Sequence, residues 1–84
     1  MPTISLFYGI AIMMYPFNKE HNPPHIHAFC GSDDASFIIA DGTILAGYFP
    51  SNKKKLVQQF IKQYKEELLN MWNTGSYYKL PPIS

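Results

Sequence analysis

Apolar and polar residues alternate along the first half of the chain, as they do in strands with one buried face. In the segment from Thr3 to Tyr15, Gly9 lies near the middle, and a glycine inside a strand often marks a bulge or a bend. The segment therefore predicts one long strand or two bent strands. We expect the core to receive the residues of one parity, which are Ile4, Leu6, Tyr8, Ile10, Ile12 and Met14.

Three more strands are predicted before Pro50, separated by turn-forming residues. His25 to Cys30 is the first of them, and the polar run Gly31-Ser32-Asp33-Asp34 returns the chain for Ala35 to Ala40. Asp41-Gly42 predicts a type I′ hairpin turn, because both central residues of that turn need a positive φ. Thr43 to Phe49 pairs back as the last strand. The pattern indicates an antiparallel β-meander of three to five strands.

The hydrophobic period changes to three and four residues after Pro50, which predicts an amphipathic helix. Ser51 or Asn52 is the expected N-cap and Gly75 the expected C-terminal cap, with the helix at about Lys53 to Asn73. The apolar stripe contains Leu56, Val57, Phe60, Ile61, Tyr64, Leu68, Met71 and Trp72. The predicted fold class is α+β, a meander packed on one face by a single long C-terminal helix.

Length and composition favour one packed domain. The chain has 84 residues, of which 46% are hydrophobic and 15% aromatic, and these values are too high for a disordered chain. We expect one domain over residues 1–84, with the sheet in 1–50, a histidine-rich loop in 21–30, the helix in 51–75 and a tail in 76–84 that lies along the body or a partner. A single cysteine, no signal peptide and no membrane span predict a soluble cytoplasmic protein.

The charge balance is close to neutral. Seven lysines oppose six acidic residues, arginine is absent, and the formal net charge is +1. This composition gives no general support for a dedicated nucleic-acid binder. Lys53 and Lys54 begin a run of three lysines at the start of the predicted helix. Such a run is most often a solvated helix end, and these two lysines are the candidates for binding an anion.

All three histidines lie in the stretch His21-Asn22-Pro23-Pro24-His25-Ile26-His27. The two prolines form a stiff, extended spacer, and residues two apart in a strand point to the same face, so His25 and His27 are expected side by side. We therefore predict a functional cluster of His21, His25 and His27, with Asn22 as a hydrogen-bonding auxiliary. An imidazole with an ordinary pKa of about 6.5 can bind a metal, transfer protons or contact phosphate.

Three functions of this cluster stay open. In an RNA endonuclease, the histidines would act as general acid and base toward a 2′-hydroxyl, with a lysine such as Lys53 stabilising the charge on phosphorus. In a zinc site, His25 and His27 would bind the metal together with His21 or Asp33. In a structural or partner-binding loop, the rings would hydrogen-bond the backbone and require no cofactor. Strand periodicity disfavours Cys30 as a nucleophile, because Cys30 and His27 have opposite parity.

The motif His21-Asn-Pro-Pro-His25-Ile-His27-Ala28 resembles a family of small bacterial proteins of unknown function with an HNPPHxHA motif. Supporting similarities are Phe7-Tyr8-Gly9-Ile10, the Asp41-Gly42 turn and Trp72. In gene arrangement that family is similar to toxin–antitoxin pairs. The resemblance implies a component of such a module, the toxin, acting on RNA and paired with an antitoxin-like protein. Unpaired sheet edges add the expectation of a homo-oligomer, a homodimer in its simplest form.

Overall fold

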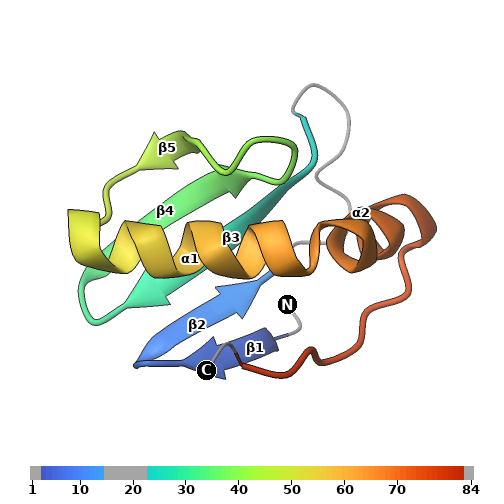
Figure 1. Cartoon of the computed structure of the whole chain (residues 1–84), viewed down its shortest axis with the longest axis horizontal. Helices are drawn as coiled ribbons and strands as arrows, with labels where there is room; N and C mark the ends of the chain where they lie inside the picture. The colour runs from blue at the N-terminus through green and yellow to red at the C-terminus, as the bar shows by residue number, and fades with distance from the viewer. Residues whose placement is uncertain (1–2, 15–22, 83–84) are drawn as a thin grey trace.

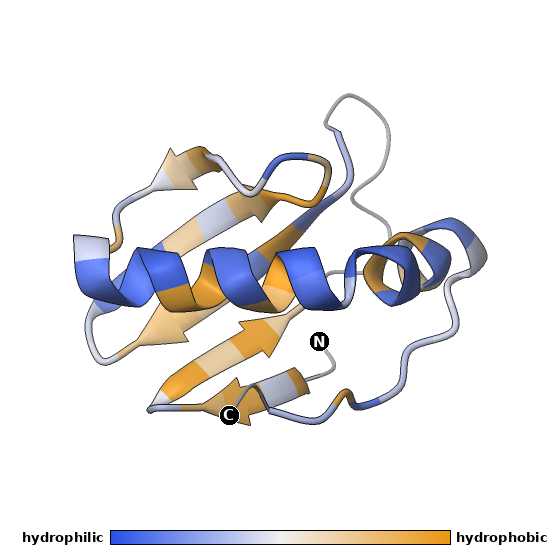
Figure 2. Ribbon diagram, viewed as in Figure 1, coloured by the Kyte–Doolittle hydropathy of each residue, from blue (hydrophilic) through white to orange (hydrophobic). Residues whose placement is uncertain are grey.

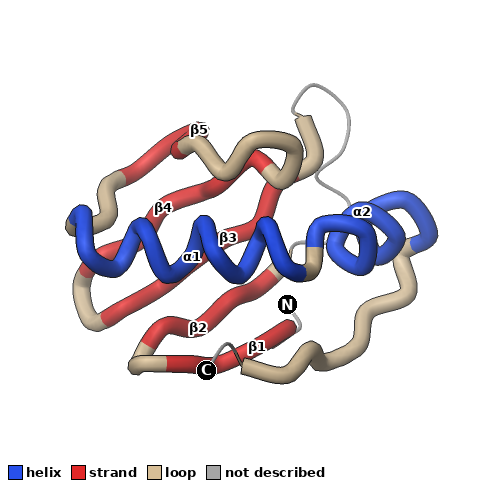
Figure 3. Tube along the Cα trace, in the orientation of Figure 1, coloured by secondary structure: helices blue, strands red, loops and turns tan. Residues whose placement is uncertain are grey.

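A computed structural model describes residues 3–14 and 23–82 of the chain. Five antiparallel strands form one sheet in the order β1-β2-β3-β4-β5, and two helices follow (Figures 1 and 3). The α+β class and the antiparallel meander are thereby confirmed. The elements are β1 (Thr3–Phe7), β2 (Ile10–Met13), β3 (His25–Cys30), β4 (Asp33–Ile38), β5 (Ile44–Gly47), α1 (Ser51–Gln63) and α2 (Lys65–Thr74).

The predicted first segment is a tight hairpin of β1 and β2. Tyr8 and Gly9 form its turn with φ values of 50° and 74°, so Gly9 does divide the segment into two arms. The predicted core set is wrong at Leu6 and Tyr8, which are 64% and 62% exposed, although Ile4 is buried as predicted. Phe7 is buried instead and pairs with Ile10, since residues opposite each other in a hairpin share one face. The alternation of buried and exposed residues shifts by one position across a two-residue turn.

The loop between β4 and β5 differs from the predicted type I′ turn. Gly42 has a φ of 76°, but Tyr8 is the one non-glycine residue with positive φ in the described part of the chain, so Asp41 does not meet the requirement. Instead the Asp41 carboxylate accepts hydrogen bonds from the amide of Thr43 at 3.0 Å and from its hydroxyl at 2.8 Å. The aspartate closes this loop with its side chain.

The single long helix of the prediction is also wrong. Tyr64 has φ −114° and ψ 25°, which ends α1 and begins α2, although neither glycine nor proline marks the break. The N-cap position of α1 is Pro50 with no side-chain cap bond, so neither Ser51 nor Asn52 caps it. The left-handed cap at Gly75 is confirmed. Neither helix in the described ranges combines the length and apolarity needed to cross a bilayer.

The core lies between the helices and one face of the sheet. In Figure 1, α1 crosses in front of the strands and α2 lies at the end of the sheet where β3 begins; Figure 2 shows polar residues on the outer side of α1. Phe60 is fully buried, and its ring stacks on Phe7 with centroids 5.1 Å apart. The bend at Tyr64 directs α2 toward the sheet end, where it buries Leu68, Met71 and Trp72.

The C-terminal tail lies along the outer edge of β1, as predicted for one of its two alternatives (Figure 1). The amide of Leu80 donates a hydrogen bond to the carbonyl of Ile4 at 2.7 Å, and the Leu80 side chain joins the core. At the opposite edge, β5 is the last strand of the sheet. The two edges of the sheet are therefore unequal.

Candidate functional site around His25 and His27

The candidate site lies on β3, whose alternating residues point to opposite faces. Ile26 and Ala28 are fully buried and point to one face of the sheet. His25 and His27 lie side by side on the other face, with ring centroids 5.1 Å apart, as the strand period predicts. Phe29 continues the row, and its ring is 6.5 Å from that of His27. The strand thus presents a short row of three aromatic rings.

His25 is a packed ring held by its surroundings. It is only 2% exposed, and its Nδ1 lies 2.8 Å from the carbonyl oxygen of Pro23. Because a carbonyl only accepts, Nδ1 must carry the proton of this bond. The indole of Trp72 lies against the imidazole with centroids 5.1 Å apart. His25 therefore connects the proline spacer, the start of β3 and helix α2.

His27 is half-buried and shares a hydrogen bond with β4. Its Nδ1 lies 3.2 Å from the hydroxyl of Ser36, the residue opposite it in the ladder. Burial, followed by the charge of His25, lowers the pKa of His27 to about 4, although the carboxylate of Asp34 acts in the opposite direction. Its Nε2 is also buried from solvent. His27 is thus neutral at pH 7.

Acid should destabilise the fold through His27. In the unfolded chain its pKa is about 6.5, so the unfolded state takes up a proton below that pH while the folded state does so only near pH 4. The free energy of unfolding should fall as pH falls across this window, by less than about 1.4 kcal/mol per pH unit because the ring is only half-buried.

Urea unfolding at a series of pH values measures this effect. His27→Gln should lose this part of the pH dependence, because glutamine does not titrate, while the slope outside the window stays the same. An imidazole titration of folded His27 near pH 6.5 by NMR would contradict the burial argument.

Of the other predicted site residues, the structure places Lys53 and Lys54 in α1. His21 and Asn22 lie outside the described residues. Lys53 donates a hydrogen bond to Sγ of Cys30 at 2.8 Å, a contact that raises the pKa of Lys53, and Lys54 follows it in the first turn of α1. Cys30 ends β3 while His25 begins it, about 16 Å away along an extended strand. Lys53 is therefore remote from His25.

Residues 3–14 and 23–82 do not provide a complete set of ligands for zinc. No group of three His, Cys, Asp or Glu side chains is arranged there to hold a metal ion. Asp33, one of the two predicted additional ligands, pairs with Cys30 at the far end of β3 from His25, and His21, the other, lies outside the described residues. The two described histidines instead contact Pro23, Ser36 and Trp72.

Sequence reasoning missed two residues that shape the site, Ser36 and Trp72. The sequence places Trp72 in the apolar stripe of one helix, whereas in the structure it lies on α2, after the break at Tyr64, and against His25. Ser36 faces His27 because Gly31-Ser32 alone form the turn, so that Cys30 pairs with Asp33 and the ladder continues from there. Had the prediction placed a two-residue turn at Gly31-Ser32, it would have paired His27 with Ser36.

Comparisons with known proteins give a family but no activity. A family model described as a domain of unknown function, DUF4160, matches residues 9–73. An uncharacterized protein of Alkalihalophilus pseudofirmus is 31% identical over 58 residues, which cover 69% of this chain and 32% of that protein. The chain thus spans about a third of the length of this relative. No solved structure matches the chain.

Proposed function

This chain belongs to the DUF4160 family, whose description assigns no activity, and we propose that it is a component of a bacterial toxin–antitoxin-type module that acts by binding a partner protein. The module follows from the resemblance carried by the segment from His21 to Ala28. The preference for a non-catalytic role is supported by one observation, the burial of the His25 ring between Pro23 and Trp72.

A general acid or base must come within hydrogen-bonding reach of the proton that it transfers. Nδ1 of His25 already contacts Pro23, and Nδ1 of His27 contacts Ser36. Efficient proton transfer also favours a pKa near the working pH, whereas the pKa of His27 is about 4. The geometry is therefore better suited to holding the proline spacer against α2 than to turning over a substrate.

Exposed apolar side chains offer contacts to a partner. Leu6 and Tyr8 are exposed near the β1–β2 turn, and Leu45 and Tyr48 are exposed at β5 and just after it. Tyrosine is enriched at protein interfaces and contributes much of their binding energy. An antitoxin-like protein or a second copy of the chain would remove them from water.

An RNA endonuclease toxin is the second candidate function. It is favoured by the close pair of imidazoles, 5.1 Å apart, in which His27 is neutral and chemically able to accept a proton. A phosphate placed beside His27 would also raise its pKa, because an opposite charge stabilises the protonated form. This mechanism requires the ring to become accessible when RNA binds.

His25→Ala and His27→Gln distinguish the two candidates. For a partner-binding protein, His25→Ala should lower the free energy of unfolding by roughly 2 kcal/mol or more, since it removes a buried, hydrogen-bonded ring. His27→Gln should retain binding to the product of the adjacent gene, measured by calorimetry. RNA cleavage by the wild type that His27→Gln abolishes, with an unchanged Tm, would overturn partner binding in favour of catalysis.

A further inference from the structure

A thiol and an amine lie in contact at the end of the sheet opposite His25. Cys30 is the last residue of β3, and its Sγ lies 2.8 Å from Nζ of Lys53, in the first turn of α1. This separation is in the range of an N–H···O hydrogen bond, although sulfur is a larger atom than oxygen. The contact is therefore a close one for a lysine and a thiol.

The surroundings hold the two groups together and leave sulfur accessible. Cys30 is half-buried, so a small solute can reach its thiol. Gly31, with a φ of 60°, begins the two-residue turn that pairs Cys30 with Asp33. The contact with Cys30, and then the carboxylate charge of Asp33, raises the pKa of Lys53. The lysine is thus attracted to this end of β3 by two partners.

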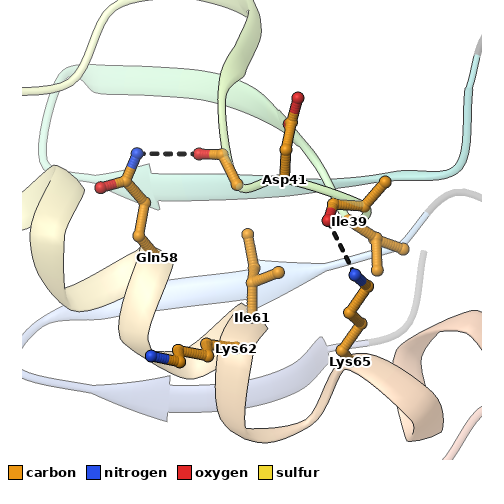
Figure 4. A pocket seen from close by; sticks show the side chains of 8 residues that line it. Ile39, Asp41, Gln58, Ile61, Lys62 and Lys65 are labelled. Carbon is orange, nitrogen blue, oxygen red and sulfur yellow. Dashed lines mark hydrogen bonds between the residues drawn. The ribbon is translucent and has the colours of Figure 1, made fainter.

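The position of α1 itself is fixed by further contacts. Nε2 of Gln58 donates a hydrogen bond to the carbonyl of Gly42 at 2.9 Å, and Nζ of Lys65 donates one to the carbonyl of Ala40 at 2.8 Å (Figure 4). In Figure 1 the start of α1 lies at the same end of the sheet as the β3–β4 turn. Groups held in place react much faster than groups that must first meet, and the Cys30–Lys53 pair meets this condition.

The chemistry of an oxidised thiol depends on its neighbours. Peroxide converts a cysteine to sulfenic acid, which condenses with a second thiol or with a nitrogen. The chain has no second cysteine, and the nitrogen beside Cys30 is the Lys53 amine at 2.8 Å. A direct sulfur–nitrogen bond is much shorter than this distance, whereas sulfur and nitrogen joined through one oxygen atom lie at nearly this separation. The geometry therefore favours an oxygen bridge.

We propose that hydrogen peroxide joins Cys30 to Lys53 through a single oxygen atom, as a reversible S–O–N cross-link. One peroxide oxidises the thiol by two electrons to Cys–SOH and releases one water. The amine gives its extra proton to water. A second peroxide then takes two electrons from the pair, so that an O–N bond replaces the sulfenic O–H and one N–H, and two waters leave. The protein gains one oxygen and loses two hydrogens. This modification does not depend on the proposed partner binding.

Treatment of the full chain with hydrogen peroxide at pH 8, where more of the amine is neutral than at pH 7, tests this cross-link. Chymotrypsin, which cuts after aromatic residues and leucine, then separates Cys30 and Lys53 into peptides 30–37 and 49–56, neither of which contains methionine. Mass spectrometry should find these peptides joined, about 14 Da above their summed mass, which is one oxygen less two hydrogens. Dithiothreitol should restore the free thiol and amine. The oxidised chain should melt roughly 10 °C higher, because the cross-link closes a loop.

Two lysine variants supply the comparison. Lys53→Arg keeps the positive charge but removes the primary amine, so it should abolish both the joined peptides and the rise in Tm. Lys54→Arg changes the next residue of the same turn and should retain both. Before oxidation, the two variants should melt within a few degrees of the wild type.

Three results would overturn the cross-link. Oxidation of Cys30 to sulfinic acid without joined peptides would show that the amine does not trap the sulfenic acid. Joined peptides that persist in Lys53→Arg would mean that sulfur reacts with any nearby lysine. A disulfide between the Cys30 residues of two copies, as the main product, would show that the thiol reaches another chain more readily than it reaches Lys53. Binding of the adjacent gene's product to the reduced chain tests the proposed function separately.

Discussion

Replacing Phe60 by alanine should lower the free energy of unfolding by about 3–5 kcal/mol. The ring is fully buried. Its centroid lies 5.1 Å from that of Phe7, on which it stacks, and 5.1 Å from that of Tyr64 at the helix break. Loss of the ring removes buried apolar surface and leaves a cavity between α1 and the β1–β2 hairpin that these elements do not close. A domain of this size has a total stability of roughly 5–10 kcal/mol, so the variant would retain only part of it.

Urea denaturation followed by circular dichroism measures this loss, and Gln59→Ala is the matched control. Gln59 is the preceding residue of the same helix but is exposed, so its replacement should change stability by less than about 0.5 kcal/mol. A Phe60→Ala variant that is no less stable than Gln59→Ala would show that α1 is not packed on the sheet.

Gly47→Ala should be the most damaging of the glycine substitutions, with a loss of about 2 kcal/mol or more. Gly47 has a φ of 89°, and an added Cβ would lie 2.5 Å from the carbonyl oxygen of Asp34 and 2.8 Å from Cα of Ala35. Both obstacles are backbone atoms of β4, so they can move only if the β4–β5 pairing is disturbed. Thermal and urea unfolding measure the change.

Gly75→Ala separates the two causes of that loss. Gly75 has a similar φ of 75°, but nothing lies within 4 Å of the position of its added Cβ. Its replacement should cost only the left-handed strain, about 1–2 kcal/mol. Equal losses in the two variants would mean that the close approach of β5 to β4 contributes nothing.

The fold was predictable where the signal is local. The alternation of apolar and polar residues and the positions of the glycines predict the meander. Apolar residues spaced three and four apart predict the helical region. The exposed Leu6 was mispredicted because one parity was extended through a two-residue turn, and register then depends on which residues that turn uses. Neither glycine nor proline marks the break at Tyr64, so the sequence pattern does not predict it.

At the candidate site, the sequence predicts which two histidines lie side by side but not how deeply their rings are buried. Strand periodicity correctly placed His25 beside His27. Chemical state depends on burial, and the partners that bury these rings come from β4 and α2, far along the chain. Lys53 resembled a candidate partner because no local signal shows that it lies beside Cys30, at the end of β3 opposite His25.

The tail that hydrogen-bonds to β1 makes growth of the sheet one-directional. Leu80 occupies part of the outer edge beside Ile4, whereas no further strand among residues 3–14 and 23–82 pairs with β5. If copies of the chain add strand to strand, β5 is the more open edge, and two copies joined edge to edge there would each have used it. Such an assembly is closed at two subunits, so the fold itself opposes stacking of the sheet into a filament.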